Sequence, residues 1–127
     1  MADYRTSLAR VRGLGTIRGG TEHFWHQRLT AIANLILLVF LIFTVIHLAG
    51  APYDAMRAYF ASPFVTVAGI ALAISATYHM RIGMQVIVED YIHAEGTKMV
   101  LLILNTFFAL AVALTCIVSL IKLSLGA

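Results

Sequence analysis

The chain has 127 residues, of which 61% are hydrophobic and 12% are charged, with a formal net charge of +3. Soluble domains carry about 25% charged residues, so this composition excludes an ordinary soluble domain and favours a membrane protein. The chain has no glycine-rich nucleotide motif, so any flavin chemistry in which it takes part belongs to partner subunits.

Residues 1–20 form a basic arm before the first apolar segment. They contain Arg5, Arg10, Arg12 and Arg18 against a single acid, Asp3. An arm of this kind suits a membrane surface or a soluble partner. It is short and nearly lacks aromatic residues, which argues against binding of nucleic acid.

Residues 21–127 are expected to form a single transmembrane domain with spans at about 28–50, 63–89 and 99–121. Each span is close to the roughly 20 residues that cross a hydrocarbon core. Backbone groups in lipid need internal partners, so the spans must be helical. The first is too long for the core of a cleaved signal peptide. We therefore predict an all-α membrane protein with three transmembrane helices.

Three potential hydrogen-bond donors, His23, His26 and Arg28, precede the first span within two helical turns. Phe24 and Trp25 beside them fit the aromatic belt at a membrane interface. One interpretation is contact with lipid headgroups. The other is that Arg28 and one histidine bind acidic groups of a buried ligand.

His79 lies about ten residues inside the second span, which is about 15 Å deep in a helix. An ionisable residue at that depth is a functional hypothesis by default. It could be an axial ligand of haem iron or a hydrogen-bonding residue between helices. Ser75, His79 and Gly83 recur every four residues and share a face, and Gly83 would leave space for a flat macrocycle. His47 falls near the opposite side, so a second axial histidine would come from another subunit.

Three further polar residues of this region each have two interpretations. Arg81 can snorkel to the interface or neutralise a haem propionate. Tyr91 can donate to a quinone carbonyl, with Asp90 orienting basic groups or relaying protons. Alternatively, Tyr91 belongs to the aromatic belt and Asp90 is simply solvated.

The third span has few polar residues and is expected to be a packing helix, with its single cysteine, Cys116, as a small packing residue. One cysteine excludes four-cysteine ligation of an iron–sulfur cluster by this chain. Of nine Lys and Arg residues, only Arg57 and Lys122 fall at the other end of the spans. The positive-inside rule then predicts that the N-terminus lies on the cytoplasmic or matrix side.

One stretch contains a specific set of residues: His79-x-x-x-Gly83, then Gln85-Val86, then Asp90-Tyr91. With Arg28 before the first span and the three-span topology, it strongly resembles the smaller membrane-anchor subunit (the D subunit, of the cytochrome b556 type) of succinate dehydrogenase, respiratory complex II. The resemblance extends over essentially all three spans.

The resemblance implies a b-type haem held between this chain and a second, larger anchor (cytochrome b) subunit. His79 matches the axial histidine of the smaller anchor, and the other ligand comes from the larger one. Arg28 resembles the arginine near the haem propionates, where Arg81 and His26 are further candidates.

The resemblance also implies a site for ubiquinone as substrate. Tyr91 matches the tyrosine that hydrogen-bonds a quinone carbonyl, and Asp90 matches the neighbouring acid that arranges the site. No residue of this chain is expected to be catalytic in the chemical step.

The implied function is that of a membrane anchor of succinate:ubiquinone oxidoreductase, an enzyme that links the tricarboxylic acid cycle to the respiratory chain. A flavoprotein subunit would oxidise succinate, and an iron–sulfur subunit would pass electrons to ubiquinone. The bacterial inner membrane is expected ahead of the mitochondrial one. The alternatives are the anchor of a quinol:fumarate reductase, a purely structural three-helix anchor, and a small transporter.

Overall fold

The computed structural model describes residues 6–8 and 17–126, and within them the secondary structure is helical. Its elements are α2 (Ile17–Leu48), α3 (Tyr53–Phe60), α4 (Pro63–Tyr91) and α5 (Glu95–Leu125). Three segments, Thr21–Leu48, Pro63–Tyr91 and Glu95–Leu125, are long and apolar enough to cross a membrane by length and composition. The predicted all-α class with three spanning helices is confirmed.

The basic arm predicted for residues 1–20 falls largely outside the described residues. Its last four residues are described, and they form the first turn of α2, which begins at Ile17. Gly19 and Gly20 are therefore helical, a conformation that costs about 1 kcal/mol per glycine relative to alanine in a helix interior. Their place near the helix start, where few backbone bonds have yet formed, reduces that cost.

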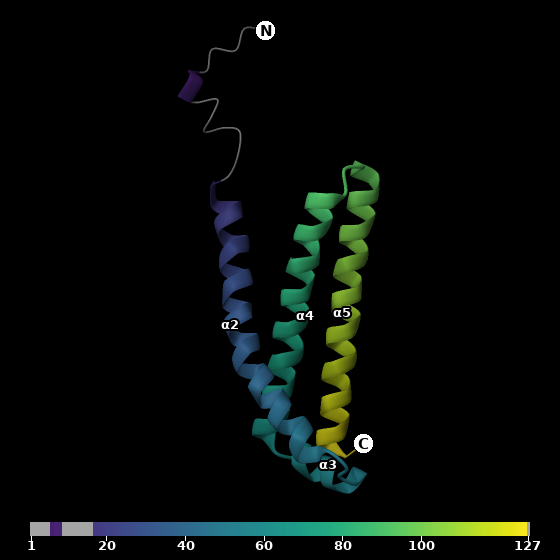
Figure 1. The fold of residues 1–127 in the computed structure, drawn as a ribbon. Helices are drawn as coiled ribbons and strands as arrows, with labels where there is room; N and C mark the ends of the chain where they lie inside the picture. The colour runs from purple at the N-terminus through teal and green to yellow at the C-terminus, as the bar shows by residue number, and fades with distance from the viewer. Residues whose placement is uncertain (1–5, 9–16, 127) are drawn as a thin grey trace.

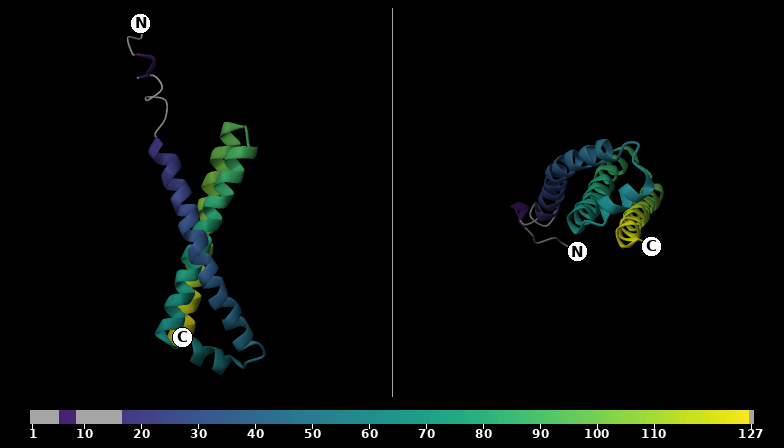
Figure 2. Two further views of the ribbon diagram at one scale, coloured as in Figure 1. Left: turned by 60° about the vertical axis from the view of Figure 1, so that its left-hand side comes forward. Right: turned by 90° about the horizontal axis from the view of Figure 1, so that it is seen from below.

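Helix α4 is the central element, and it packs against α5 on one side and α2 on the other. Figure 1 shows α4 and α5 running side by side in opposite directions. The two views of Figure 2 show that α2 crosses α4 at an angle, so the two separate toward the start of α2. The start of α2, the end of α4 and the start of α5 thus lie at one end of the molecule, which we call the Tyr91 end.

At the other end, α3 lies across the end of α2, the start of α4 and the end of α5 (Figure 1). The hydroxyls of Thr44 and Tyr59 lie 3.1 Å apart and join α2 to α3. Arg57 Nη2 donates to the carbonyl of Gly126 over 3.0 Å and joins α3 to the end of α5. The connection between the first two spans is therefore a short helix with its own tertiary contacts.

Helix α4 begins at Pro63, as expected of a proline whose fixed φ suits the first helical position. Ser62 is the N-cap residue, but its side chain makes no capping hydrogen bond. The helix ends at Tyr91, where Ile92 takes an extended conformation. This end positions Asp90 and Tyr91 in the last turn of α4.

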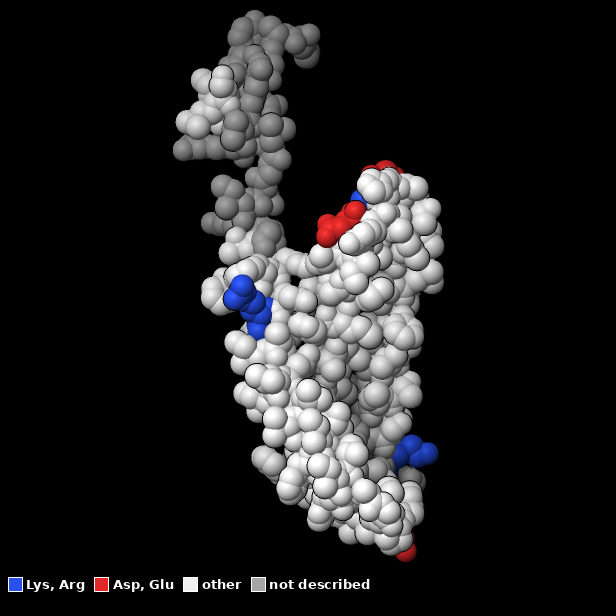
Figure 3. Space-filling model, in the orientation of Figure 1, with Lys and Arg blue, Asp and Glu red and all other residues white. Residues whose placement is uncertain are grey.

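The surface is mostly apolar. Among the described residues, the buried apolar side chains are Val65, Ile82, Val88 and Ala109, whereas large side chains such as Phe64 stand 77% exposed. Figure 3 shows charged side chains toward the two ends and a broad uncharged band between them on the face in view. Because water does not favour such a band, lipid or partner helices are its expected environment.

Gly69 of α4 faces the side chain of Leu120 on α5. A Cβ added there would lie 3.2 Å from Cδ1 of Leu120, which is tighter than ordinary packing. We expect Gly69→Leu to overpack this contact and destabilise the protein by about 1–3 kcal/mol. Thermal unfolding in detergent, followed by the loss of helical circular dichroism, measures the effect.

Gly96 provides the matched control, because a Cβ there would meet nothing within 4 Å. Gly96→Ala should leave the unfolding temperature unchanged or slightly raise it, since alanine restricts the unfolded chain. Equal unfolding temperatures for Gly69→Leu and the wild type would show that Leu120 yields freely, and would contradict tight packing.

Candidate functional site between α2 and α4

Polar side chains gather where α2 and α4 face each other, toward the Tyr91 end. On α4, the expected stripe of Ser75, His79 and Gly83 contributes, and Nδ1 of His79 lies 3.0 Å from Oγ1 of Thr30 on α2. A Cβ added at Gly83 would lie 3.8 Å from Nε2 of Gln27, so Gly83 also faces α2. We call this group the α2–α4 polar seam, and its members are His23, His26, Gln27, Thr30, Asn34, Ser75, Tyr78, His79 and Gly83.

A second contact across the seam joins His26 and Tyr78. The Tyr78 hydroxyl lies 3.1 Å from Nδ1 of His26, and the two rings meet edge to face with centroids 5.9 Å apart. The seam is thus connected by two side-chain hydrogen bonds, each of which pairs a histidine with a hydroxyl. Both histidines are held in position from the opposite helix.

Four buried polar atoms in the seam have no hydrogen-bond partner among the described residues: Nε2 of His23, Oε1 of Gln27, Oδ1 of Asn34 and Oγ of Ser75. Each such atom costs about 1–3 kcal/mol relative to a satisfied one. Polar side chains can also join helices that pack in lipid. Because buried polar groups usually have hydrogen-bond partners, the unpartnered atoms make the seam a candidate functional region.

An open groove runs beside the seam. It has a volume of about 440 Å³, and its walls are mainly apolar, with Thr30, Ser75 and Tyr78 supplying the polar groups. His79 itself is half-buried, and in the described part of the chain its only hydrogen-bonding contact is the one at Nδ1. Its second ring nitrogen, Nε2, has no hydrogen-bond partner among the described residues.

Arg81 points away from the seam. Its Nε donates to the hydroxyl of Thr106 on α5 over 3.2 Å, and the amide of Asn105 donates to the Arg81 carbonyl over 2.9 Å. A step of two residues turns the side chain by about 200° around a helix, so His79 faces α2 while Arg81 faces α5. The structure gives Arg81 a contact in the α4–α5 interface.

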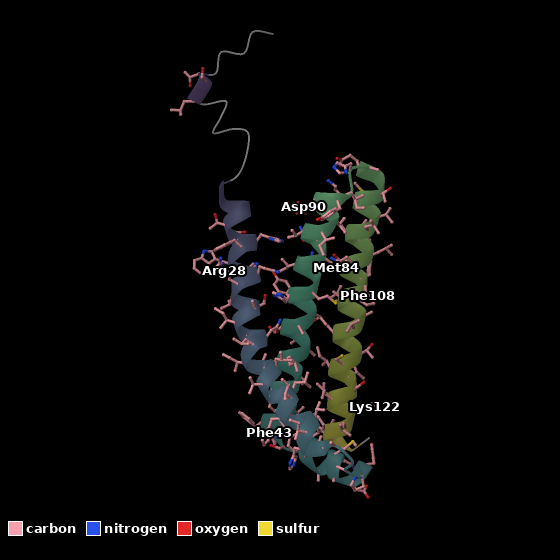
Figure 4. All side chains as sticks on the ribbon, viewed as in Figure 1. Arg28, Phe43, Met84, Asp90, Phe108 and Lys122 are labelled. Carbon is pink, nitrogen blue, oxygen red and sulfur yellow. The ribbon has the colours of Figure 1, made fainter. Side chains whose placement is uncertain are left out.

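Arg28 is exposed on α2. Its guanidinium carbon lies 4.4 Å from the centre of the Phe24 ring, one turn earlier in the helix. Figure 4 shows Arg28 on α2 and Asp90 on α4 toward the same end, with Lys122 at the opposite end. Arg28 is thus displayed outward near the seam, without a contact to His79.

Asp90 and Tyr91 lie in the last turn of α4 and are exposed, with Tyr91 at 75%. The grooves at the seam and at the α4–α5 interface are not lined by Asp90 or Tyr91. The structure therefore pairs His79 with Thr30 and His26 with Tyr78. It leaves Tyr91 exposed at the end of α4.

Four residues of the seam were not predicted from the sequence as site residues: Thr30, Tyr78, Gln27 and Asn34. A usable signal was present, because the polar residues of the first span recur at positions 23, 27, 30 and 34, a helical spacing of three or four. Matching this stripe to the one through His79 would have predicted that the two helices face each other.

Among the described residues, the seam could supply one axial ligand to a haem but not a complete metal site. In the part that the structure describes, no three His, Cys, Asp or Glu side chains come together as a metal site. A haem iron needs only an axial ligand from a given chain, and His79 offers one nitrogen without a partner. The unpartnered polar atoms, the open groove and Gly83, which has no side chain, all lie where α4 faces α2.

The fold defines a small multi-pass membrane protein with a polar contact between two of its spanning helices. The chain belongs to the family of succinate dehydrogenase/fumarate reductase transmembrane subunits, whose family model matches residues 2–118. This confirms the resemblance to the D-type anchor drawn from the sequence.

Individual relatives agree. The chain is 27% identical over 124 residues to the succinate dehydrogenase hydrophobic membrane anchor subunit of Paracoccus denitrificans, with 98% of this chain and 95% of the relative covered. It is 24% identical to the subunit of that name from Rickettsia bellii, over 92% of this chain and 94% of the relative. The succinate dehydrogenase membrane anchor subunit of Reclinomonas americana is 31% identical over 75% of this chain and 82% of the relative. No solved structure matches the chain.

Proposed function

We propose that this chain is the smaller membrane anchor of a bacterial succinate:ubiquinone oxidoreductase, which it holds at the inner membrane while it shares a b-type haem and a ubiquinone site with its partners. Membership of the family supports the anchor role. The haem assignment is supported by His79. Its Nδ1 contacts Thr30 of α2, and its Nε2 has no hydrogen-bond partner among the described residues. The chain has no complete active site of its own.

His79 would supply one axial nitrogen, and a second anchor (cytochrome b) subunit would supply the other. When bound, the haem provides a one-electron carrier beside the path to quinone. Arg28, exposed and free of an acidic partner in the described structure, can turn toward a propionate, and His26, a member of the seam two residues earlier in α2, is a further candidate. Arg81 is the weaker candidate for a propionate, because it already contacts Thr106.

The quinone site would be completed at the Tyr91 end, against the partner subunits. A quinone carbonyl needs a hydrogen-bond donor, and the exposed Tyr91 hydroxyl is free to provide one. The Asp90 carboxylate next to it can orient basic groups of a partner or take part in proton delivery. An iron–sulfur subunit would dock at this end and receive electrons from a flavoprotein subunit that oxidises succinate.

The orientation follows from charge. Arg28, Arg81 and Lys98 lie toward the Tyr91 end, and the four arginines of residues 1–20 precede that end in the chain. The positive-inside rule places this end, with the quinone site, in the cytoplasm of a bacterium. The soluble subunits and lipid headgroups would meet the chain there.

Two alternatives have specific support. The family model covers fumarate reductase subunits as well, so the same anchor could serve a quinol:fumarate reductase. A purely structural anchor is favoured by the contact of His79 with Thr30, which by itself can join two helices.

Purification of the tagged chain from detergent-solubilised membranes tests the proposal. We expect a flavoprotein, an iron–sulfur subunit and a second apolar anchor to co-purify in equal amounts, with succinate:ubiquinone reductase activity. Kinetic comparison of succinate oxidation with fumarate reduction by quinol then separates the two enzyme classes. Purification of this chain alone, with the activity found in another fraction, would contradict the proposal.

A further inference from the structure

We propose that Thr30 is a positioning residue for His79: its hydroxyl oxygen accepts a hydrogen bond from Nδ1–H and thereby fixes the tautomer and ring orientation that offer Nε2 to the haem iron. The inference rests on the proposed function, because it concerns the same imidazole. It adds a residue of α2 to a site that the family motif places on α4.

Thr30 has a single hydroxyl proton to donate. Its Oγ1 lies 2.7 Å from the carbonyl oxygen of His26 and 3.2 Å from that of Gln27. The shorter distance is the most common one for an O–H···O hydrogen bond. Threonine hydroxyls in helices often donate back to the carbonyl four residues earlier. The proton of Thr30 is thus directed along its own helix.

The consequence for His79 follows from counting protons. With its proton donated to the His26 carbonyl, the Thr30 oxygen can only accept at the 3.0 Å contact with Nδ1 of His79. A neutral imidazole has one N–H, so the proton lies on Nδ1 and Nε2 keeps its lone pair. A nitrogen with a free lone pair is the form that binds a metal.

The contact also restrains the ring. Histidines that bind metals usually donate their other N–H to an acceptor that sets their orientation, and loss of that acceptor typically costs about 10–100-fold in metal affinity or activity. Thr30 is half-buried in the α2–α4 polar seam, where no water is needed to complete the contact. The restraint also transmits the position of α2 to the ligand on α4.

The test compares Thr30→Val with Thr30→Ser in the purified complex. Valine keeps the shape of the side chain and removes the hydrogen-bond acceptor. We therefore expect haem to dissociate from the assembled complex about tenfold faster after dilution into haem-free detergent. The remaining haem should have a raised midpoint potential, because a ligand without this hydrogen bond donates less charge to ferric iron. The low-spin ferric electron paramagnetic resonance signal should also broaden. Thr30→Ser, which retains the hydroxyl, should restore all three properties.

Thr77→Val is the matched control. The Thr77 hydroxyl has the same two intrahelical contacts, 2.6 Å to the Ala73 carbonyl and 3.2 Å to that of Ile74, but no contact with a histidine. It should leave the haem potential and spectrum unchanged. If Thr30→Val leaves them unchanged as well, or if Thr30→Ser behaves like valine, the positioning role is overturned.

The failure of the proposed function would look different. In that case the wild-type complex would contain no haem, or His79→Ala would retain it, and the Thr30 variants would have no haem property to alter. A wild-type haem that is lost in His79→Ala but indifferent to Thr30→Val would instead refute only the inference about Thr30.

Discussion

Replacement of His79 by alanine is expected to abolish the b-type absorption bands of the reduced complex while the complex still assembles. His79 lies deepest in its spanning helix among the histidines of the seam, its Nε2 has no hydrogen-bond partner among the described residues, and a haem iron deprived of one axial imidazole loses its low-spin spectrum. We expect the haem content per complex to fall at least about tenfold. Reduced-minus-oxidised difference spectra, normalised to the flavin of the purified complex, provide the measurement.

His47→Ala is the control for this variant, because His47 lies near the other end of α2, where its ring stacks on Phe43. It removes a second histidine of a spanning helix without touching the seam, and should retain the full spectrum. Unaltered bands in His79→Ala would remove His79 from the axial role and leave it as a hydrogen-bonding residue between helices.

Much of the fold could be predicted from the sequence because lipid restricts the choices so strongly. An apolar run of about 20 residues in lipid must be helical to satisfy its backbone hydrogen bonds, so the three spans could be predicted. The start of α4 at Pro63 could also be predicted, because the fixed φ of proline suits the first helical position. In contrast, α3 is short and held by contacts of Arg57 and Tyr59 with distant residues, and such contacts leave no local pattern.

Only the part of the candidate site on α4 could be predicted from the sequence. The stripe through His79 is visible because histidine is rare in lipid, but the sequence does not say which helix it faces. Thr30 is an ordinary residue at the start of an apolar span, and only the crossing of α2 over α4 gives it a role. Arg81 was ambiguous for a similar reason, since its partner Thr106 lies on α5 and the sequence does not give the register of α5 against α4.

The exposed apolar band and the unpartnered atoms of the seam are both consistent with a chain that packs against lipid and other subunits. A chain with so few buried side chains has little core of its own, and its stability depends on lipid and on the subunits it meets. A site shared between subunits is consistent with this, because each chain then contributes only part of the ligand set. For this reason the expected effects of His79 and Tyr91 are measured in the assembled complex.

Tyr91→Phe is expected to lower ubiquinone reduction about tenfold while succinate oxidation with a soluble artificial acceptor stays near the wild-type rate. The substitution removes one hydroxyl from an exposed residue and preserves the ring. Loss of a hydrogen bond that strengthens as the quinone oxygen gains charge is worth about 1.4 kcal/mol for each tenfold in rate. The soluble acceptor takes electrons before the quinone site, so its reduction does not depend on Tyr91.

Tyr53→Phe is the matched control, because Tyr53 is also an exposed tyrosine, 62% accessible, but lies on α3 at the opposite end of the helices. It should leave both activities intact. A parallel loss of both activities in Tyr91→Phe would indicate damaged assembly at the Tyr91 end, and unchanged quinone reduction would exclude a hydrogen bond from this hydroxyl to the substrate. If only quinone reduction falls, the effect should lie mainly in kcat when the hydroxyl acts on the charge that develops during reduction, and mainly in KM when it only holds the quinone. The two constants together therefore establish whether the last turn of α4 binds quinone or also assists its reduction.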